Sequence, residues 1–169
     1  MQINISEILS NPSVEKEYNL NFDMESISFR RRSFPVTEKK EFVFSINRQG
    51  KKMHISLDTE VSILIPCDRC LDDVAFAFPV SVDRDINLDR LSDGNKDEDE
   101  LLFIDGYMLD VDKLISDEIV VALPSKVLCS EDCKGLCPVC GTNLNHDSCH
   151  CDREVFDPRM AIFKDFHLE

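Results

Sequence analysis

Cysteines are the residues of this chain with the clearest chemical potential. Eight of them occur, and six lie close together between Cys129 and Cys151. Free buried thiols would explain scattered cysteines, but a cluster needs another explanation. A chain of 169 residues can bury a sizeable core without disulfide cross-links. The cluster therefore favours metal binding.

The strongest motif is the knuckle CPVCG, which contains Cys137 and Cys140 and ends at Gly141. Two cysteines separated by two residues can bind one tetrahedral ion, and the glycine permits the positive φ angle that closes the turn. A knuckle supplies only two ligands, so other residues must complete the site. Either of two cysteine pairs could do so, namely Cys129 with Cys133 or Cys149 with Cys151. A histidine, His146 or His150, could also replace one of the sulfur ligands.

Zinc is the expected ion, because four soft sulfur ligands in a closed tetrahedral site suit it. An iron–sulfur cluster also accepts four cysteines and is the alternative. Residues 129–157 contain few apolar side chains and cannot bury a core of their own. Metal binding is therefore expected to drive the folding of this segment, which gives the ion a structural role.

A second cysteine pair, Cys67 and Cys70, is also separated by two residues. Together with Cys129 and Cys133, this pair would make a second metal site and use all eight cysteines. The alternative is a thiol-redox pair, because Arg69 beside Cys70 would favour a thiolate. The spacing alone does not decide between these two functions.

Basic residues gather in the first third of the chain, where they could form a patch for RNA phosphates. The patch comprises Arg30, Arg31, Arg32, Lys39, Lys40, Arg48, Lys51 and Lys52. No interleaved aromatic residues indicate base stacking, so solvated strand ends and loops are the alternative interpretation. The net charge of −14 argues against an extensive nucleic-acid-binding surface and makes DNA an unexpected partner.

No set of catalytic residues is evident. The sequence has no glycine-rich phosphate loop, no nucleophile elbow and no HExxH motif. Its four histidines are too few for a convincing acid–base site, and most carboxylates fall in predicted loops. We therefore expect a protein that is not an enzyme.

The elements that must position the cysteines begin with β-strands. Apolar and polar residues alternate from Phe42 to Ile46, from Met53 to Ile65 and from Val74 to Val82. Turn-forming residues 47–50 separate the first two runs and predict a hairpin, and Pro79 in the third run predicts an edge or a bulge. The three runs together predict an antiparallel meander.

Two helices are expected. Asp110 caps the first, which ends before Pro124, and Asp157 caps the second. The apolar face of the first helix comprises Leu114, Ile115, Ile119 and Ala122. Asp105 and Gly106 predict a tight hairpin turn before it. The predicted fold is α+β: a small antiparallel sheet, one or two packing helices and a C-terminal zinc-knuckle segment.

The pattern predicts two parts. Residues 1–128 form an α+β core domain with a mobile acidic loop at 89–100, and residues 129–169 form a cysteine-rich metal-binding segment with a terminal helix. No apolar run approaches the roughly 20 residues that cross a membrane, and the N-terminus lacks the pattern of a signal peptide. We therefore expect a cytoplasmic protein with reduced thiols and no membrane partner.

Two blocks of sequence resemble the YceD family, a bacterial and plastid domain of unknown function. One block is CDRCL, which begins at Cys67. The other is CSEDCKGLCPVCGTNLNHDSCHC, which begins at Cys129 and is followed by DPRMAIFKDF. With the acidic loop and the helix that ends in ALP, they extend the resemblance over most of the chain.

The resemblance implies a role in the accumulation or processing of large-subunit ribosomal RNA, without a known catalytic activity. Some family members keep only the CxRC pair, which favours a structural zinc site and implies a functional role for Cys67, Arg69 and Cys70. The expected protein is a ribosome assembly factor whose partners are large-subunit ribosomal RNA or a precursor ribosome, and basic ribosomal proteins. The alternative is a zinc-stabilised protein-binding factor, or a thiol-redox factor that uses Cys67 and Cys70.

Overall fold

The computed structural model describes residues 1–88 and 103–152, and the chain divides into two compact units. The first unit comprises Met1–Ile65 and Ala75–Ser125, and the second comprises Pro66–Val74 and Lys126–Glu169. The expected division ran between residues 128 and 129. The segment that contains Cys67 and Cys70 groups instead with the cysteine-rich tail, so one unit contains all eight cysteines.

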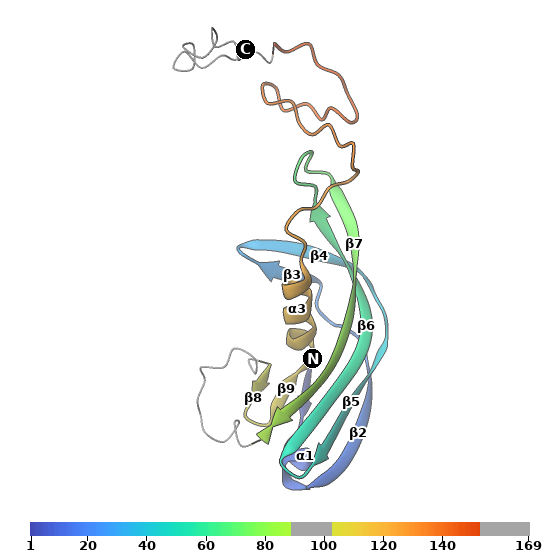
Figure 1. Cartoon of the computed structure of the whole chain (residues 1–169), viewed down its shortest axis with the longest axis vertical. Helices are drawn as coiled ribbons and strands as arrows, with labels where there is room; N and C mark the ends of the chain where they lie inside the picture. Colours follow the sequence, from blue (N-terminus) through green and yellow to red (C-terminus); the bar gives the residue numbers. More distant parts are fainter. Residues whose placement is uncertain (89–102, 153–169) are drawn as a thin grey trace, which may run out of the picture. The chain divides into compact units, whose positions relative to one another are not determined.

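A six-stranded sheet forms the centre of the first unit (Figure 1). Its strands are β2 (Ser13–Leu20), β3 (Ser26–Phe29), β4 (Arg32–Lys39), β5 (Phe42–Gln49), β6 (Lys52–Pro66) and β7 (Asp73–Asn87). Strands β2, β5, β6, β4 and β3 follow one another, and β7 pairs with β6. The predicted meander is therefore present as β5, β6 and β7, and three further strands enlarge the sheet beyond the small one expected.

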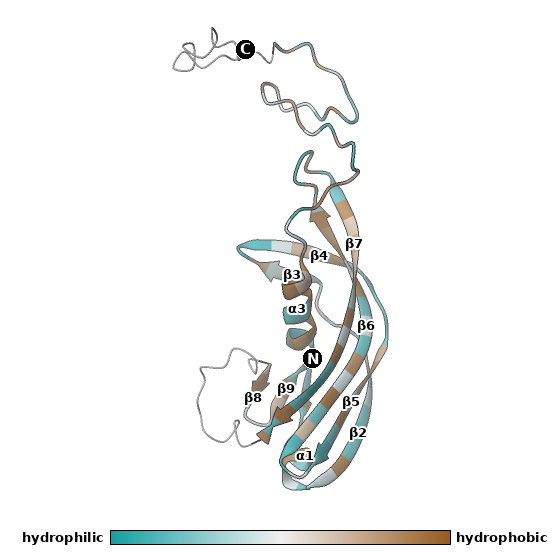
Figure 2. Cartoon of the chain, in the orientation of Figure 1, coloured by the Kyte–Doolittle hydropathy of each residue, from teal (hydrophilic) through white to brown (hydrophobic). Residues whose placement is uncertain are grey.

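Strand β6 follows directly from its sequence. Its apolar side chains at alternate positions are buried: Met53, Ile55, Leu57, Val61, Ile63 and Ile65. Most of the residues between them are exposed or half-buried, and Figure 2 shows the alternation as brown and teal bands. Removing one apolar face from water is the main force that holds such a strand in its sheet.

The β5–β6 hairpin turns later than the sequence suggests. Asn47 and Arg48 continue β5 and pair with His54 and Met53. The chain reverses at Gly50, where φ is +63°. Glycine adopts this left-handed conformation without the Cβ clash of other residues, so the reversal occurs at the glycine and not at the polar residues before it.

A three-stranded antiparallel sheet accompanies the large one, with the order β1, β9, β8. Its strands are β1 (Gln2–Asn4), β8 (Ile104–Asp105) and β9 (Met108–Asp110), and the short helix α1 (Ser6–Ser10) follows β1. Strands β8 and β9 form the tight hairpin predicted at Gly106, which has φ of +57°.

Helix α3 (Val111–Ala122) begins at the predicted cap, because the Asp110 side chain accepts a hydrogen bond from the Lys113 backbone N–H at 3.1 Å. Its buried face includes Leu114, Ile115 and Ile119. Ala122 is exposed, contrary to prediction, because the last turn extends beyond the buried part of the helix.

The large sheet is curved, and α3 lies on its inner side (Figure 1), where Arg84 of β7 forms an ion pair with Glu118. Among the strands that the structure describes, β7 pairs with β6 alone, which agrees with Pro79 in an edge strand.

The predicted acidic loop at 89–100 and the predicted helix from Asp157 lie outside the described residues. Within residues 1–88 and 103–152, no helix is both long enough and apolar enough to cross a membrane.

Candidate metal centres

Two groups of four cysteines lie in the second unit, and within each group the sulfur atoms are all within 4.8 Å of one another. We call them the CDRC site and the CPVC site after their knuckles. The CDRC site comprises Cys67, Cys70, Cys129 and Cys133. The CPVC site comprises Cys137, Cys140, Cys149 and Cys151. Of the two pairs that could complete the CPVC knuckle, the fold selects the downstream one.

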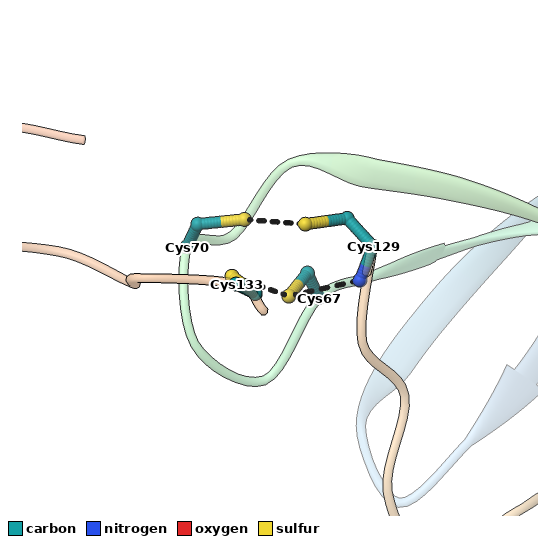
Figure 3. A group of neighbouring side chains, drawn as sticks. All are labelled: Cys67, Cys70, Cys129 and Cys133. Atoms are coloured by element: carbon teal, nitrogen blue, oxygen red, sulfur yellow. Dashed lines mark hydrogen bonds between the residues drawn. The ribbon is translucent and has the colours of Figure 1, made fainter. Parts of the chain in front are cut away.

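Figure 3 shows the four sulfur atoms of the CDRC site pointing toward one another. Cys67 and Cys70 come from the loop after β6, and the other two come from the segment after residue 125. The sulfurs of Cys67 and Cys133 are 3.8 Å apart, and those of Cys70 and Cys129 are 3.5 Å apart. Residues far apart in the sequence therefore form one cluster.

These separations suit a shared metal ion. Two sulfurs bound at about 2.3 Å to one tetrahedral ion lie about 3.8 Å apart. A disulfide would bring two sulfurs to about 2.0 Å, and all eight cysteines are free. Four sulfurs leave no open position on a tetrahedral ion, so either group could hold a structural metal but would give a substrate no place to bind.

Backbone N–H groups favour the thiolate forms that metal binding requires. Burial disfavours the charge on Cys67, but N–H groups of Cys70, Arg69 and Cys129 directed at its sulfur lower its pKa to about 6. The N–H groups of Cys140 and Val139 likewise lower the pKa of Cys137 to about 6. Both knuckles thus stabilise their first sulfur as an anion, as a zinc knuckle does.

The two knuckles close with different residues. Gly141 ends the CPVC turn with φ of +75°, and its N–H donates to the Cys137 carbonyl at 2.9 Å. Leu71 occupies the same position in the CDRC turn with φ of +66°, and its N–H donates to the Cys67 carbonyl at 3.0 Å. A leucine in this conformation is strained by about 1–2 kcal/mol, so the contacts of the CDRC turn must hold it there.

Arg69 is part of the scaffold of the CDRC site. Its guanidinium donates to the Cys133 carbonyl at 3.0 Å, and its own carbonyl accepts from the Leu136 N–H at 3.1 Å. A Cβ atom on Gly135 would lie only 3.0 Å from that carbonyl oxygen. The guanidinium therefore joins the two chain segments, and its hydrogen bond goes to a carbonyl oxygen, not to a sulfur.

The histidines considered as ligands lie outside both four-sulfur groups. Nε2 of His146 lies 3.1 Å from the carboxylate of Asp72. Sequence spacing alone did not reveal this role, because a histidine three residues before a cysteine also suits a metal ligand. His150 belongs to neither group.

Three polar residues near the sulfurs were missed by the sequence analysis: Asp72, Asn143 and Asn145. Nδ2 of Asn145 donates to the Cys133 sulfur at 3.3 Å. Asp72 accepts two hydrogen bonds from Nδ2 of Asn143, at 2.9 and 3.0 Å. Polar loop residues of this kind are common in any sequence, so no pattern in the chain distinguishes them.

The predicted basic patch is divided among three places: the β3–β4 hairpin, the end of β4 and its connection to β5, where Lys39 and Lys40 lie, and the β5–β6 hairpin. The β3–β4 and β5–β6 hairpins lie at different ends of the large sheet (Figure 1). Arg30, Arg31 and Arg32 are exposed at the β3–β4 hairpin. At the β5–β6 hairpin, Arg48 donates to the carbonyls of Gly50 and Ile8, so it supports the fold.

The lysines of the patch have partners of their own. Lys40 pairs with Glu60 at 2.6 Å, and Lys52 lies 3.4 Å from Asp85. Lys39 lies 5.9 Å from the centre of the Phe22 ring, and Lys51 also takes part in an interaction. Arg30 likewise lies 5.1 Å from the centre of the Phe29 ring, but it shares one exposed hairpin with Arg31 and Arg32. These three arginines are therefore the cations of the patch best placed to meet a phosphate.

Comparison with known proteins identifies one family. The family model described as "Large ribosomal RNA subunit accumulation protein YceD" matches residues 55–167. The match thus includes all eight cysteines but begins after the arginines of the β3–β4 hairpin. No solved structure matches the chain significantly.

The curated relatives are mostly uncharacterised. A protein of Mycobacterium tuberculosis is 32% identical over 56% of this chain and 46% of its own length. YlbN of Bacillus subtilis is 28% identical over 68% of this chain and 67% of its own length. A chloroplast protein of Arabidopsis thaliana, named "Large ribosomal RNA subunit accumulation protein YCED homolog 1", is 39% identical over 29% of this chain and 15% of its own length. The chain thus spans about half of the mycobacterial relative.

Proposed function

Because this chain belongs to the YceD family, we propose that it is a non-enzymatic, cytoplasmic factor that supports the accumulation of large-subunit ribosomal RNA. The family match over residues 55–167 is the observation that carries this proposal. A ribosome-related role also agrees with the name of the chloroplast relative. Depletion of the protein should lower the amount of mature large-subunit RNA and of free large subunits in sucrose gradients, and unchanged gradients would contradict the proposal.

We also propose that the CDRC and CPVC sites each bind one structural zinc ion. Two closed four-sulfur groups with near-tetrahedral separations support zinc, which prefers such ligands and has no redox chemistry of its own. The ions would hold together a segment with little apolar core. Metal analysis of the purified full chain should give two zinc ions per molecule, whereas iron with sulfide would indicate clusters instead.

A redox role for Cys67 and Cys70 is less well supported than metal binding. Cys67 and Cys70 are both buried, at 0% and 3% exposure, and they share their cluster with two further cysteines. A reactive pair should be accessible to the thiol it attacks. Alkylation should therefore be slow in the zinc-loaded protein and fast once a chelator has removed the ions.

The β3–β4 hairpin supports a direct contact with RNA. Phe29 pairs with Arg32, so Arg30 and Arg31 alone form the two-residue turn. Their φ angles are +47° and +68°, a conformation for which asparagine and glycine are preferred. Arginines at these positions are strained by about 1–2 kcal/mol each. Their presence is better explained by a requirement for exposed positive charge than by folding.

Replacing the two arginines separates folding from binding. In the double variant R30N/R31G, the turn keeps its shape with less strain, so thermal stability should stay the same or rise. RNA affinity should fall. The slope of the logarithm of the RNA association constant against the logarithm of the salt concentration should become less negative by roughly one to two, because about two phosphate contacts are lost. Binding to a large-subunit RNA fragment, measured by fluorescence anisotropy at several salt concentrations, checks this.

The matched control removes two other cations. Lys16, which pairs with Glu7, is in β2, and Lys113 is in helix α3, so neither belongs to the β3–β4 hairpin. The variant K16Q/K113Q changes the net charge by the same amount and should leave the salt dependence nearly unchanged. An equal loss of RNA affinity in both double variants would mean that RNA binding depends on overall charge, and it would contradict a specific role for the β3–β4 hairpin.

A further inference from the structure

The loop between Cys140 and Cys149 belongs to the CPVC site but makes contacts with the CDRC site. Its residue Asn145 donates from Nδ2 to the Cys133 sulfur at 3.3 Å. Oδ1 of the same side chain accepts from the Lys134 N–H at 2.8 Å. One amide thus holds both the sulfur and the backbone that follows it. Hydrogen bonds of this kind orient a ligand and stabilise its thiolate.

The same loop supplies the donors for a carboxylate next to another CDRC ligand. Asp72 lies 3.3 Å from the sulfur of Cys70. When Cys70 binds a metal as a thiolate, two negative charges would face each other at this distance. Asn143 donates two hydrogen bonds to Asp72, and Nε2 of His146 lies 3.1 Å away. These groups offset the repulsion only while the loop keeps its conformation.

Backbone contacts attach the loop to the segment that leaves Cys133. Leu136 and Asn143 form an isolated β-bridge, and the Leu144 N–H donates to the Gly135 carbonyl at 2.9 Å. Both ends of the loop are ligands of the CPVC site. A short polar loop with no core of its own has little reason to stay ordered unless an ion holds its ends.

We propose that metal binding at the CPVC site organises the CDRC site, so that the two ions bind cooperatively, with Asn145 and Asn143 as the positioning residues that couple them. This inference rests on the proposed zinc sites. Linkage requires the coupling to be reciprocal: emptying either site should weaken the other by the same factor.

Native mass spectrometry of the full chain during titration with EDTA tests the coupling. The wild-type protein should pass from two zinc ions to none with little one-zinc species. The variant C137S/C140S should lose the CDRC zinc at a chelator concentration that leaves the wild type fully loaded. A variant that keeps one zinc ion as tightly as the wild type would overturn the coupling. A wild-type chain without zinc would overturn the zinc sites themselves.

Single substitutions distinguish positioning from general damage. N145A should still bind two zinc ions but release the CDRC ion about 10–100 times more readily, as loss of such a supporting hydrogen bond does elsewhere. D147A is the matched control, because Asp147 is exposed in the same loop and should behave as the wild type. If N145A and D147A release zinc from the CDRC site equally readily, Asn145 is not a positioning residue.

The charge at Asp72 offers a rescue experiment. N143A should weaken zinc binding at the CDRC site, because Asp72 then faces the Cys70 thiolate with fewer donors. The double variant N143A/D72N should recover much of that loss, since the amide carries no charge to repel the thiolate. Far-UV circular dichroism of every variant should show an unchanged sheet signal. A double variant weaker than N143A would refute the electrostatic part of the coupling.

Discussion

At the scale of single residues, the two knuckles solve one geometric problem in two ways. Both need a positive φ angle directly after their second cysteine, and one uses Gly141 while the other uses Leu71. The leucine is 64% exposed, so burial of its side chain does not repay the strain. The hydrogen bonds of the turn must therefore supply the stabilisation, together with an ion when one is bound.

Two glycines of the second unit allow backbone strain to be separated from steric clash. Gly135 and Gly141 have nearly equal φ angles, +73° and +75°. An added Cβ meets the Arg69 carbonyl oxygen at 3.0 Å in the first case and nothing within 4 Å in the second. We expect G141A to destabilise the unit by about 1 kcal/mol and G135A by distinctly more.

The comparison should be made on the zinc-loaded chain, by amide hydrogen exchange within residues 126–152. Faster exchange in G135A than in G141A would reflect the clash with the arginine carbonyl. Equal exchange in the two variants would mean that the CDRC turn shifts easily away from Gly135, and that Arg69 does not hold the two segments tightly.

At the scale of elements, the sequence predicted what periodicity and local caps control. Strands β5, β6 and β7 follow from alternating apolar residues, and α3 follows from its cap at Asp110. Strand β2 was missed because its residues alternate between exposed and half-buried positions without a clear apolar face. The pairing of Cys67 and Cys70 with a distant segment was an open alternative, since spacing within a knuckle says nothing about its partner in space.

The β6–β7 pair carries a charge cluster with a predictable pH dependence. His54 and Lys52 of β6 donate to Asp85 of β7 at 3.0 and 3.4 Å and lower the pKa of this carboxyl. A lowered folded-state pKa contributes stability that is present above the unfolded value of about 3.8 and is lost as the pH falls toward the folded value. The difference in urea stability between the wild type and D85N should therefore be full at pH 6 and should shrink as the pH falls below about 4.

Asp83 provides the reference for this titration. Its carboxylate lies 3.9 Å from Nε2 of His54, beyond the range of a good hydrogen bond. The variant D83N should accordingly differ less from the wild type than D85N does at pH 6. A constant difference between wild type and D85N at every pH would show that the amide disturbs packing and that the charge of Asp85 is not involved.

At the scale of the whole molecule, the two units depend on different forces. The first unit buries an apolar core that includes Phe44, Ile55 and Ile119, each at 0% exposure. In the described part of the second unit, the small buried cluster consists of Cys67, Cys70 and Cys133, with Val74 and Leu128 packed against it. Apolar burial can hold the first unit alone, whereas the second is expected to depend on the proposed metal ions.

Removal of the ions should therefore affect the units unequally. With excess EDTA, backbone amides of residues 129–151 should exchange rapidly, because ordering so polar a segment costs conformational entropy that little apolar burial offsets. Amides of β5 and β6 should keep their protection, since these strands are paired over Phe44–Gln49 and hold their apolar faces without a metal. Hydrogen exchange with mass spectrometry measures both regions in one sample, and readdition of zinc should restore protection to residues 129–151.

Two outcomes would contradict this division. If residues 129–151 stay protected in the metal-free chain, their hydrogen bonds are enough to keep the segment ordered. If β5 and β6 lose protection, the ions stabilise the first unit as well.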